Sequence, residues 1–153
     1  MPADAPLTSP DCNHFAVRSA ARHVTQFYDQ FLAPIGLRTS QFSILSKLKR
    51  LGPLTINALA KEMVMDRTTL ARNVQPLERD GLIRTGPVVS DRRAKALRLT
   101  NAGEKRVRAG LKAWARAQAQ FERSSGTKRA TELRIVALVV AIELAPAPQS
   151  ANR

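Results

Sequence analysis

The sequence predicts a mainly α-helical fold with a small β-wing, a single hairpin in the second half of the chain. Apolar residues recur at three- and four-residue steps through most of the 153 residues, which is the periodicity of amphipathic helices. Residues 82–100 break this pattern, because Val, Ile and Leu there flank a basic stretch and partly alternate with polar residues. At this length we expect one compact unit.

Helix-capping and helix-breaking residues indicate where the elements begin and end. Pro34 and Gly36 end the first helix, and Gly81 ends the fourth in the left-handed conformation that glycine favours. Thr39 and Asp66 are the expected N-caps of the second and fourth helices. The expected helices cover residues 13–33, 40–52, 56–63, 67–80, 101–121 and 128–144, and the strands cover 82–89 and 96–100, joined by a basic loop at 90–95.

The charge balance indicates a polyanionic partner. The chain has 25 Lys and Arg against 12 Asp and Glu, a formal net charge of +13, and 18 of the basic residues are Arg. The planar guanidinium suits phosphates and base edges better than the Lys ammonium does. No apolar run approaches the roughly 20 residues of a membrane-spanning helix, and the N-terminus does not resemble a secretory signal. We therefore expect a cytoplasmic protein without a membrane partner.

Catalytic and metal-binding patterns are absent from the sequence. It has no Ser, His and Asp set, no Gly-rich phosphate loop and no metal-ligand spacing. The single cysteine, Cys12, excludes an intrachain disulfide and a multi-cysteine zinc site. The sequence thus predicts a binding protein and no enzyme, with no cofactor and no metal.

Residues 54–100 have the order of a winged helix-turn-helix: helix, short turn, helix, hairpin. If Leu70, Val74 and Leu77 face the core, the opposite side of the fourth helix is free to enter the major groove. Arg reads guanine, Asn reads adenine, and Thr contacts a thymine methyl or a phosphate. Such residues near the helix start are the candidate base readers: Arg67, Thr68, Thr69, Arg72 and Asn73. Arg92 or Arg93 at the hairpin tip is a candidate for the minor groove.

Three segments together resemble the MarR family of bacterial transcriptional regulators, over about residues 13–144. They are Leu54–Ala60, Asp66–Ile83 and Asp91–Thr100, and the last is similar to the family's wing pattern, Asp-x-Arg-x-Lys followed by Leu-Thr. The resemblance implies that Asp91 pairs with Arg93, which leaves Arg92 as the minor-groove probe. Lys95 and Arg98 are expected to neutralise phosphates.

The last helix is apolar on all sides, with Val136 and Val140 on one side and Leu138 and Ile142 on the other. A helix of this kind must be buried all round, and we expect a second subunit to bury it. The first, fifth and sixth helices then form an intertwined homodimer, with Trp114 and Phe121 in its core or in helix packing. The expected division is a DNA-binding lobe at 38–100, a helical dimerisation region at 13–37 and 101–144, and disordered tails at 1–12 and 145–153.

The resemblance also places an effector pocket between the first helix, the second helix and the DNA-binding lobe. His14 and Arg18 would receive an organic carboxylate there, and Phe42 would supply an apolar wall. The alternative is that His14 and Arg18 are ordinary structural residues.

Cys12 precedes the first helix, where the helix N-terminus and His14 would stabilise the thiolate of a redox sensor. The alternative is an inert thiol. The peroxide-sensing branch of the family places a reactive cysteine near this point and partners it with tyrosines at the start of the second helix. The matching positions here are Thr39 and Phe42, so these partners are missing and an effector-pocket or structural role is favoured.

These features predict a sequence-specific transcriptional regulator. We expect a homodimeric repressor that binds a pseudo-palindromic operator in double-stranded DNA and is released by a small aromatic or amphipathic effector. Two recognition helices related by a twofold axis would enter successive major grooves about 34 Å apart. The alternatives are redox sensing through Cys12 and an architectural protein that coats DNA without sequence preference.

Overall fold

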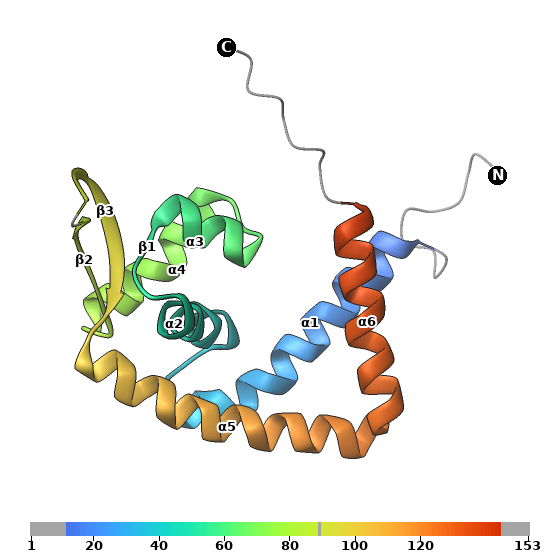
Figure 1. Cartoon of the computed structure of the whole chain (residues 1–153). Helices are drawn as coiled ribbons and strands as arrows, with labels where there is room; N and C mark the ends of the chain where they lie inside the picture. The colour runs from blue at the N-terminus through green and yellow to red at the C-terminus, as the bar shows by residue number, and fades with distance from the viewer. Residues whose placement is uncertain (1–11, 89, 145–153) are drawn as a thin grey trace, which may run out of the picture. The chain divides into compact units, whose positions relative to one another are not determined.

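The computed structural model describes residues 12–88 and 90–144, apart from the side chain of Arg92. The expected tails at 1–12 and 145–153 lie outside the described residues except for Cys12. The mainly helical fold with a small sheet is confirmed (Figure 1). The elements are α1 (Asn13–Leu32), the 3-10 helix η1 (Ala33–Ile35), α2 (Thr39–Leu51), β1 (Leu54–Thr55), α3 (Ile56–Met63), α4 (Arg67–Arg79), β2 (Ile83–Val88), β3 (Asp91–Leu99), α5 (Asn101–Ser125) and α6 (Thr127–Glu143).

The chain divides into two compact units, Met1–Ala115 and Arg116–Arg153, where the sequence predicted one. The boundary falls within α5, because a helix of 25 residues is long enough to belong to both units. The first unit contains α1 to β3 and the first part of α5. None of the described helices is long and apolar enough to span a bilayer.

The N-terminus of α2 differs from the sequence prediction. The N-cap is Arg38, whose backbone N–H donates to Gln41 Oε1 at 3.0 Å, and Thr39 is the first helical residue. Both the N–H and the hydroxyl of Thr39 instead donate to Asp29 Oδ1 of α1, each at 2.6 Å. The expected N-cap role of Thr39 was therefore wrong, because a tertiary contact with α1 uses its hydroxyl.

The sheet has three antiparallel strands in the order β1-β3-β2. The two-residue β1 was not expected, and it pairs Leu54 with Leu97 of β3. β3 begins at Asp91, so most of the basic stretch that we expected to be a loop is strand, with an irregular register at Pro87 and Val88 of β2. That prediction was wrong because strand pairing, and not alternation along the stretch, determines its conformation.

The core of the first unit lies between α2, α3, α4 and the inner face of the sheet. Leu70, Val74 and Leu77 of α4 are buried, which confirms the inward face that the sequence indicated. The largest fully buried side chains are Leu32, Ile44, Leu45, Leu59, Leu70, Leu77, Ile83 and Val107. Burial of this many aliphatic side chains holds α4 against α2 and α3.

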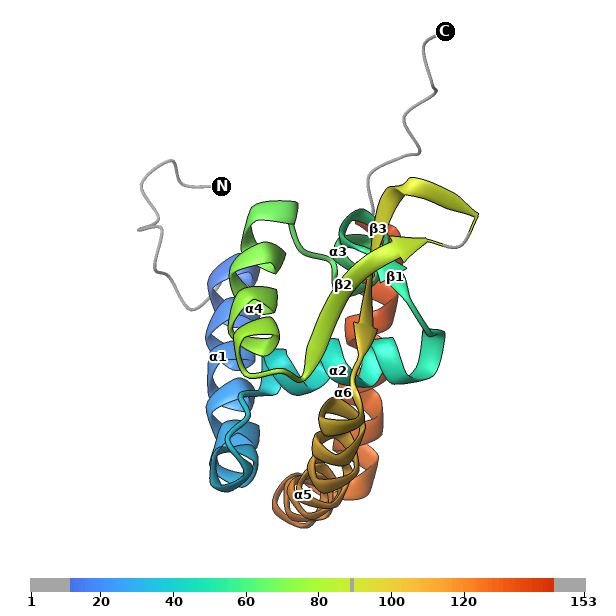
Figure 2. The ribbon, with the colours of Figure 1, turned by 90° about the vertical axis from the view of Figure 1, so that its left-hand side faces the viewer.

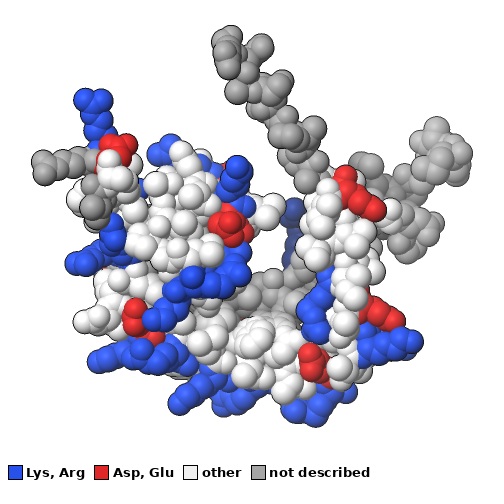
Figure 3. Space-filling model, viewed as in Figure 1, with Lys and Arg blue, Asp and Glu red and all other residues white. Residues whose placement is uncertain are grey.

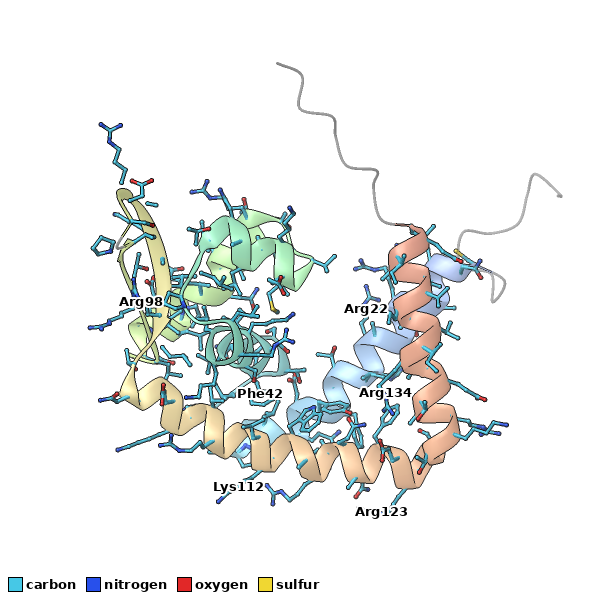
Figure 4. The ribbon with its side chains drawn as sticks, viewed as in Figure 1. Arg22, Phe42, Arg98, Lys112, Arg123 and Arg134 are labelled. Carbon is cyan, nitrogen blue, oxygen red and sulfur yellow. The ribbon has the colours of Figure 1, made fainter. Side chains whose placement is uncertain are left out.

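The buried face of α5 consists of Val107 and of small residues. Val107 is buried, but Leu111 is 47% exposed and Trp114 is 41% exposed. The buried positions include small residues such as Gly110, where an added Cβ would lie 2.5 Å from the Phe42 ring (Figure 4). Close helix approach within this chain thus uses small residues of α5, and the expected place of Trp114 in the dimer core stays a prediction.

Candidate nucleic-acid interface

Three residues, Val64, Met65 and Asp66, form the turn between α3 and α4. Val64 takes the left-handed conformation (φ 52°, ψ 45°), which β-branched residues rarely adopt, and its side chain is 94% exposed. The Met65 N–H then closes the turn on the Ala60 carbonyl at 3.0 Å. Asp66 follows and begins α4. The turn therefore sets the angle between the two helices at the expense of backbone strain at one residue.

Asp66 is the N-cap of α4, as the sequence predicted. Its carboxylate accepts the Thr69 N–H at 2.8 Å and the Thr69 hydroxyl at 2.5 Å. The Thr69 hydroxyl, followed by the Thr69 N–H, lowers the pKa of Asp66 below its ordinary value, because both donors stabilise the ionised form. These hydrogen bonds fix the first turn of the helix. Because the Thr69 hydroxyl is bonded to Asp66, Thr69 presents mainly its methyl group to a partner.

Four of the five candidate base readers lie on the exposed side of α4. Arg67, Thr68, Thr69 and Arg72 are all exposed, and they occupy the first two turns of the helix. Pro76, which cannot donate a backbone hydrogen bond, lies in the last turn, three residues before the helix ends at Arg79. The half of α4 that carries the candidate readers therefore keeps regular helical geometry.

Asn73 differs from the other four candidates. It is half-buried, its Nδ2 donates to the Thr69 carbonyl at 2.9 Å, and its Oδ1 accepts the hydroxyl of Ser40 at 3.1 Å. We expected it on the solvent side, and that placement was wrong because Ser40, at the start of α2, lies against this side of α4. Asn73 thus connects the two helices. Ser40 was not identified from the sequence, because no local pattern links residues 33 positions apart.

The wing formed by β2 and β3 is attached to α4 and stiffened at its tip. The Thr85 hydroxyl of β2 donates to Glu78 near the end of α4, and Figure 2 shows α4 and the hairpin side by side. Near the tip, Asp91 Oδ1 accepts the backbone N–H of Arg93 at 2.9 Å. The expected pairing of Asp91 and Arg93 therefore uses the backbone of Arg93, which leaves its guanidinium available.

Basic side chains surround this surface. Arg93 and Lys95 are exposed on β3, whereas the side chain of Arg92 lies outside the described residues. Figure 3 shows Lys and Arg side chains over the hairpin and along α5, with fewer Asp and Glu among them. The exposed start of α4 and the basic wing together form a surface that suits a polyanion.

The residues expected in an effector or redox role have different surroundings. His14 and Arg18 are exposed on α1, and their expected role in an effector pocket stays a prediction. Phe42 is 6% exposed and packs in the core beside Gly110. Cys12 is half-buried and is the N-cap residue of α1, where its carbonyl accepts the Ala16 N–H at 3.0 Å. Among the described residues no cluster of His, Cys, Asp and Glu could hold a metal ion.

Helix, turn, helix and a three-stranded sheet with a projecting hairpin define a winged helix-turn-helix protein. The model of the MarR family matches residues 37–95. The transcriptional regulator MosR of M. tuberculosis is 32% identical, with 88% of this chain and 97% of that chain covered and a TM-score of 0.72. MosR in complex with DNA is 33% identical, with 90% and 100% covered and a TM-score of 0.74. The chain belongs to the MarR family.

A curated relative agrees with this assignment. The HTH-type transcriptional regulator YwoH of Bacillus subtilis is 30% identical over 92 residues, which cover 59% of this chain and 65% of YwoH. The match thus spans slightly less than two thirds of the relative. These relatives are transcriptional regulators, and the protein is of that class and not an enzyme.

Proposed function

We propose that the protein is a homodimeric transcriptional repressor that binds a pseudo-palindromic operator and is released by a small organic effector. The observation that carries DNA binding is the capped start of α4, where Arg67, Thr68 and Arg72 are exposed beside a basic wing. In this proposal α4 enters the major groove, and Arg92 or Arg93 enters the minor groove. MosR, the similar regulator, has been solved in complex with DNA, which supports the same use of the fold here.

The dimer proposal rests on apolar surface that this chain exposes. Along α6, Ile135 is 56% exposed, Leu138 61%, Val139 44% and Ile142 67%. A contiguous apolar surface of this kind is typical of an interface, because a soluble monomer rarely exposes one. α1 and α5 contribute exposed Phe15 and Trp114, so the proposed dimerisation region comprises residues 13–37 and 101–144. The proposed DNA-binding lobe comprises residues 38–100, which include the wing and α2 to α4.

Arg72→Ala tests base reading, with Arg79→Ala as the matched control. Both are exposed arginines on α4, but Arg79 lies at its C-terminal end and contacts Asp80 at 3.3 Å. After the preferred site has been selected from random duplexes, Arg72→Ala should weaken binding there by about 1–3 kcal/mol and change binding to random DNA little. Equal losses on both kinds of DNA, or equal losses for the two variants, would remove Arg72 from base reading.

Footprinting and light scattering test the remaining parts. The regulator should protect one symmetric site, whereas an architectural protein would give a uniform pattern. Leu138→Glu should convert the dimer to a monomer in light scattering and weaken operator binding with it, because a charge would be buried in an apolar interface. A monomeric wild type, or a dimeric Leu138→Glu variant, would contradict the proposed interface.

The effector proposal involves His14 and Arg18, which lie one turn apart on the same exposed side of α1 and can bind one carboxylate together. The ring of Phe42 is enclosed in the core. Its expected role as an apolar wall of the effector pocket therefore stays a prediction from the sequence. Benzoate titrated into the protein–operator complex should release the DNA from wild type and require higher concentrations with Arg18→Ala. Release at the same concentration from both proteins would remove Arg18 from the effector site.

A further inference from the structure

Two arginines face each other directly at the base of the wing. Arg84 of β2 and Arg98 of β3 are Cα partners in the antiparallel pair. Like charges at directly opposite positions destabilise such a pair. Arg98 Nη2 donates one hydrogen bond to the Pro87 carbonyl at 3.2 Å, and within the described part of the chain neither guanidinium belongs to an ion pair. The sheet therefore carries two cations at directly opposite positions, and neither is paired with an acidic side chain in that part of the chain.

A cavity of about 280 Å³ lies beside this pair, entirely within the first unit. Arg84 and Arg98 line one part of it, and Leu48, Pro53 and Leu99 provide apolar surface. The cavity is found where α2 ends and β1 begins alongside β3. Figure 4 shows Arg98 in the half of the hairpin nearer to α5. The site therefore combines two guanidinium groups with apolar surface that can contact an organic group.

The acidic residue of the cavity is already paired. Glu104 contacts Lys49 at 3.2 Å and Arg108 at 3.9 Å, one with each carboxylate oxygen. Glu104 is thus neutralised by residues other than the arginine pair, and the cavity keeps an excess of positive charge from Arg84 and Arg98. An anion that enters the cavity would meet both arginines without competing with a free carboxylate.

We propose that this cavity binds a small phosphate monoester. Two guanidinium forks match the several oxygens and the double charge of a phosphate monoester, whereas a carboxylate would neutralise only one of them. The apolar surface of Leu48 and Pro53 would contact the organic group. The volume lies just below the usual range for ligand pockets, about 300–1,000 Å³, so the ester must be small. Binding would also remove the repulsion within the arginine pair.

A phosphate of the DNA backbone could also bind the two arginines. The position of Arg98 in the wing distinguishes this ligand from a free phosphate monoester. Arg98 is seven residues from Asp91 at the tip, about 23 Å along a strand with a rise of about 3.3 Å per residue. A wing whose tip enters the minor groove would therefore hold the cavity well away from the phosphates beside the tip. The proposed site is thus separate from the candidate base readers of α4 and from the wing tip, and it replaces the phosphate-neutralising role that the sequence suggested for Arg98.

Isothermal titration with phenyl phosphate, in the absence of DNA, tests the proposal. Wild type should bind it, and Arg84→Gln and Arg98→Gln should each weaken binding about tenfold or more, because each removes a charge-assisted contact. Arg98→Lys should bind between wild type and Arg98→Gln, since it keeps the charge and loses the fork. Arg93→Gln is the matched control, an exposed arginine of the same strand near the tip, and it should bind like wild type.

Thermal melting gives a second measurement on the same proteins and shows that each variant is folded. Without ligand, Arg84→Gln should melt at or above wild type, because the like-charge pair is gone, and phenyl phosphate should raise the melting temperature of wild type and Arg93→Gln but not that of Arg84→Gln or Arg98→Gln. The proposal is overturned if wild type does not bind phenyl phosphate, if Arg93→Gln loses as much as Arg98→Gln, or if Arg98→Gln weakens the binding of benzoate as much as the binding of phenyl phosphate. Loss of duplex affinity in both glutamine variants, without any phenyl phosphate binding, would assign the arginines to the DNA backbone instead.

Discussion

The hydrogen bond between Ser40 and Asn73 decides whether Asn73 reads a base or positions the recognition helix. Ser40 Oγ donates to Asn73 Oδ1 at 3.1 Å, and both side chains are half-buried. A neutral hydrogen bond of this kind contributes about 0.5–1.5 kcal/mol to stability. Because water can partly replace it at a half-buried position, we expect Ser40→Ala to cost about 0.5–1 kcal/mol. For a chain of this size the melting temperature should fall by about 1–4 °C.

A double-mutant cycle in urea measures this bond directly. Ser40→Ala, Asn73→Ala and the double variant should give a coupling energy of about 0.5–1 kcal/mol, and both single variants should weaken operator binding without changing base preference. Ser46→Ala is the matched control on α2: its buried hydroxyl has no hydrogen-bond partner among the described residues, so this variant should be neutral or stabilising. Zero coupling, together with loss of preference at one base pair in Asn73→Ala alone, would refute the positioning role and restore base reading.

Three further predictions concern the scaffold. Val64→Gly should raise stability by about 0.5–1 kcal/mol over Val64→Ala, because only glycine removes the left-handed strain; equal stability would contradict this. Asp66 has a lowered pKa, so its capping contribution is complete above its ordinary range and is lost as the pH falls through the lowered value; the melting-temperature gap between wild type and Asp66→Asn should shrink in acid, and a constant gap would be evidence against it. Gly110→Ala should cost about 1–3 kcal/mol by crowding Phe42, whereas Gly86→Ala, with open space around it, should not; similar melting temperatures would refute the crowding.

The helices could be predicted from the sequence because their ends carry local chemistry. Asp66 and Gly81 mark the two ends of α4 by a cap and a left-handed residue, and both act within a few positions along the chain. The prediction failed where the determining contact is distant. The hydroxyl of Thr39 is bound by Asp29 of α1, and the strand that begins at Asp91 depends on pairing with β2. On α5 the buried Gly110 could not be recognised from the sequence, because only the approach of the Phe42 ring shows why a residue without a side chain is needed there.

In the candidate site too, the features that depend on local sequence could be predicted, and those that depend on distant contacts could not. The inward residues of α4 imply which side of the helix is outward, so Arg67 and Arg72 could be placed from periodicity alone. Periodicity does not reveal which residues of other elements pack against the edge of this exposed face. Ser40 of α2 does so, where it contacts Asn73. Arg84 was missed as a site residue because only the strand register brings it opposite Arg98.

The contacts of Thr39 and Ser40 have a consequence for the proposed effector response. An effector bound on α1 can change DNA binding only if it favours one arrangement of α4 over another. Asp29 of α1 binds Thr39 at 2.6 Å, and the next residue, Ser40, binds Asn73 of α4 at 3.1 Å. Two successive residues of one rigid helical turn thus join α1 to the recognition helix. A displacement of α1 must therefore either move the first turn of α2, and α4 with it, or break the hydrogen bonds to Asp29, and Asp29→Ala should reduce effector release of DNA while leaving binding of the effector itself intact.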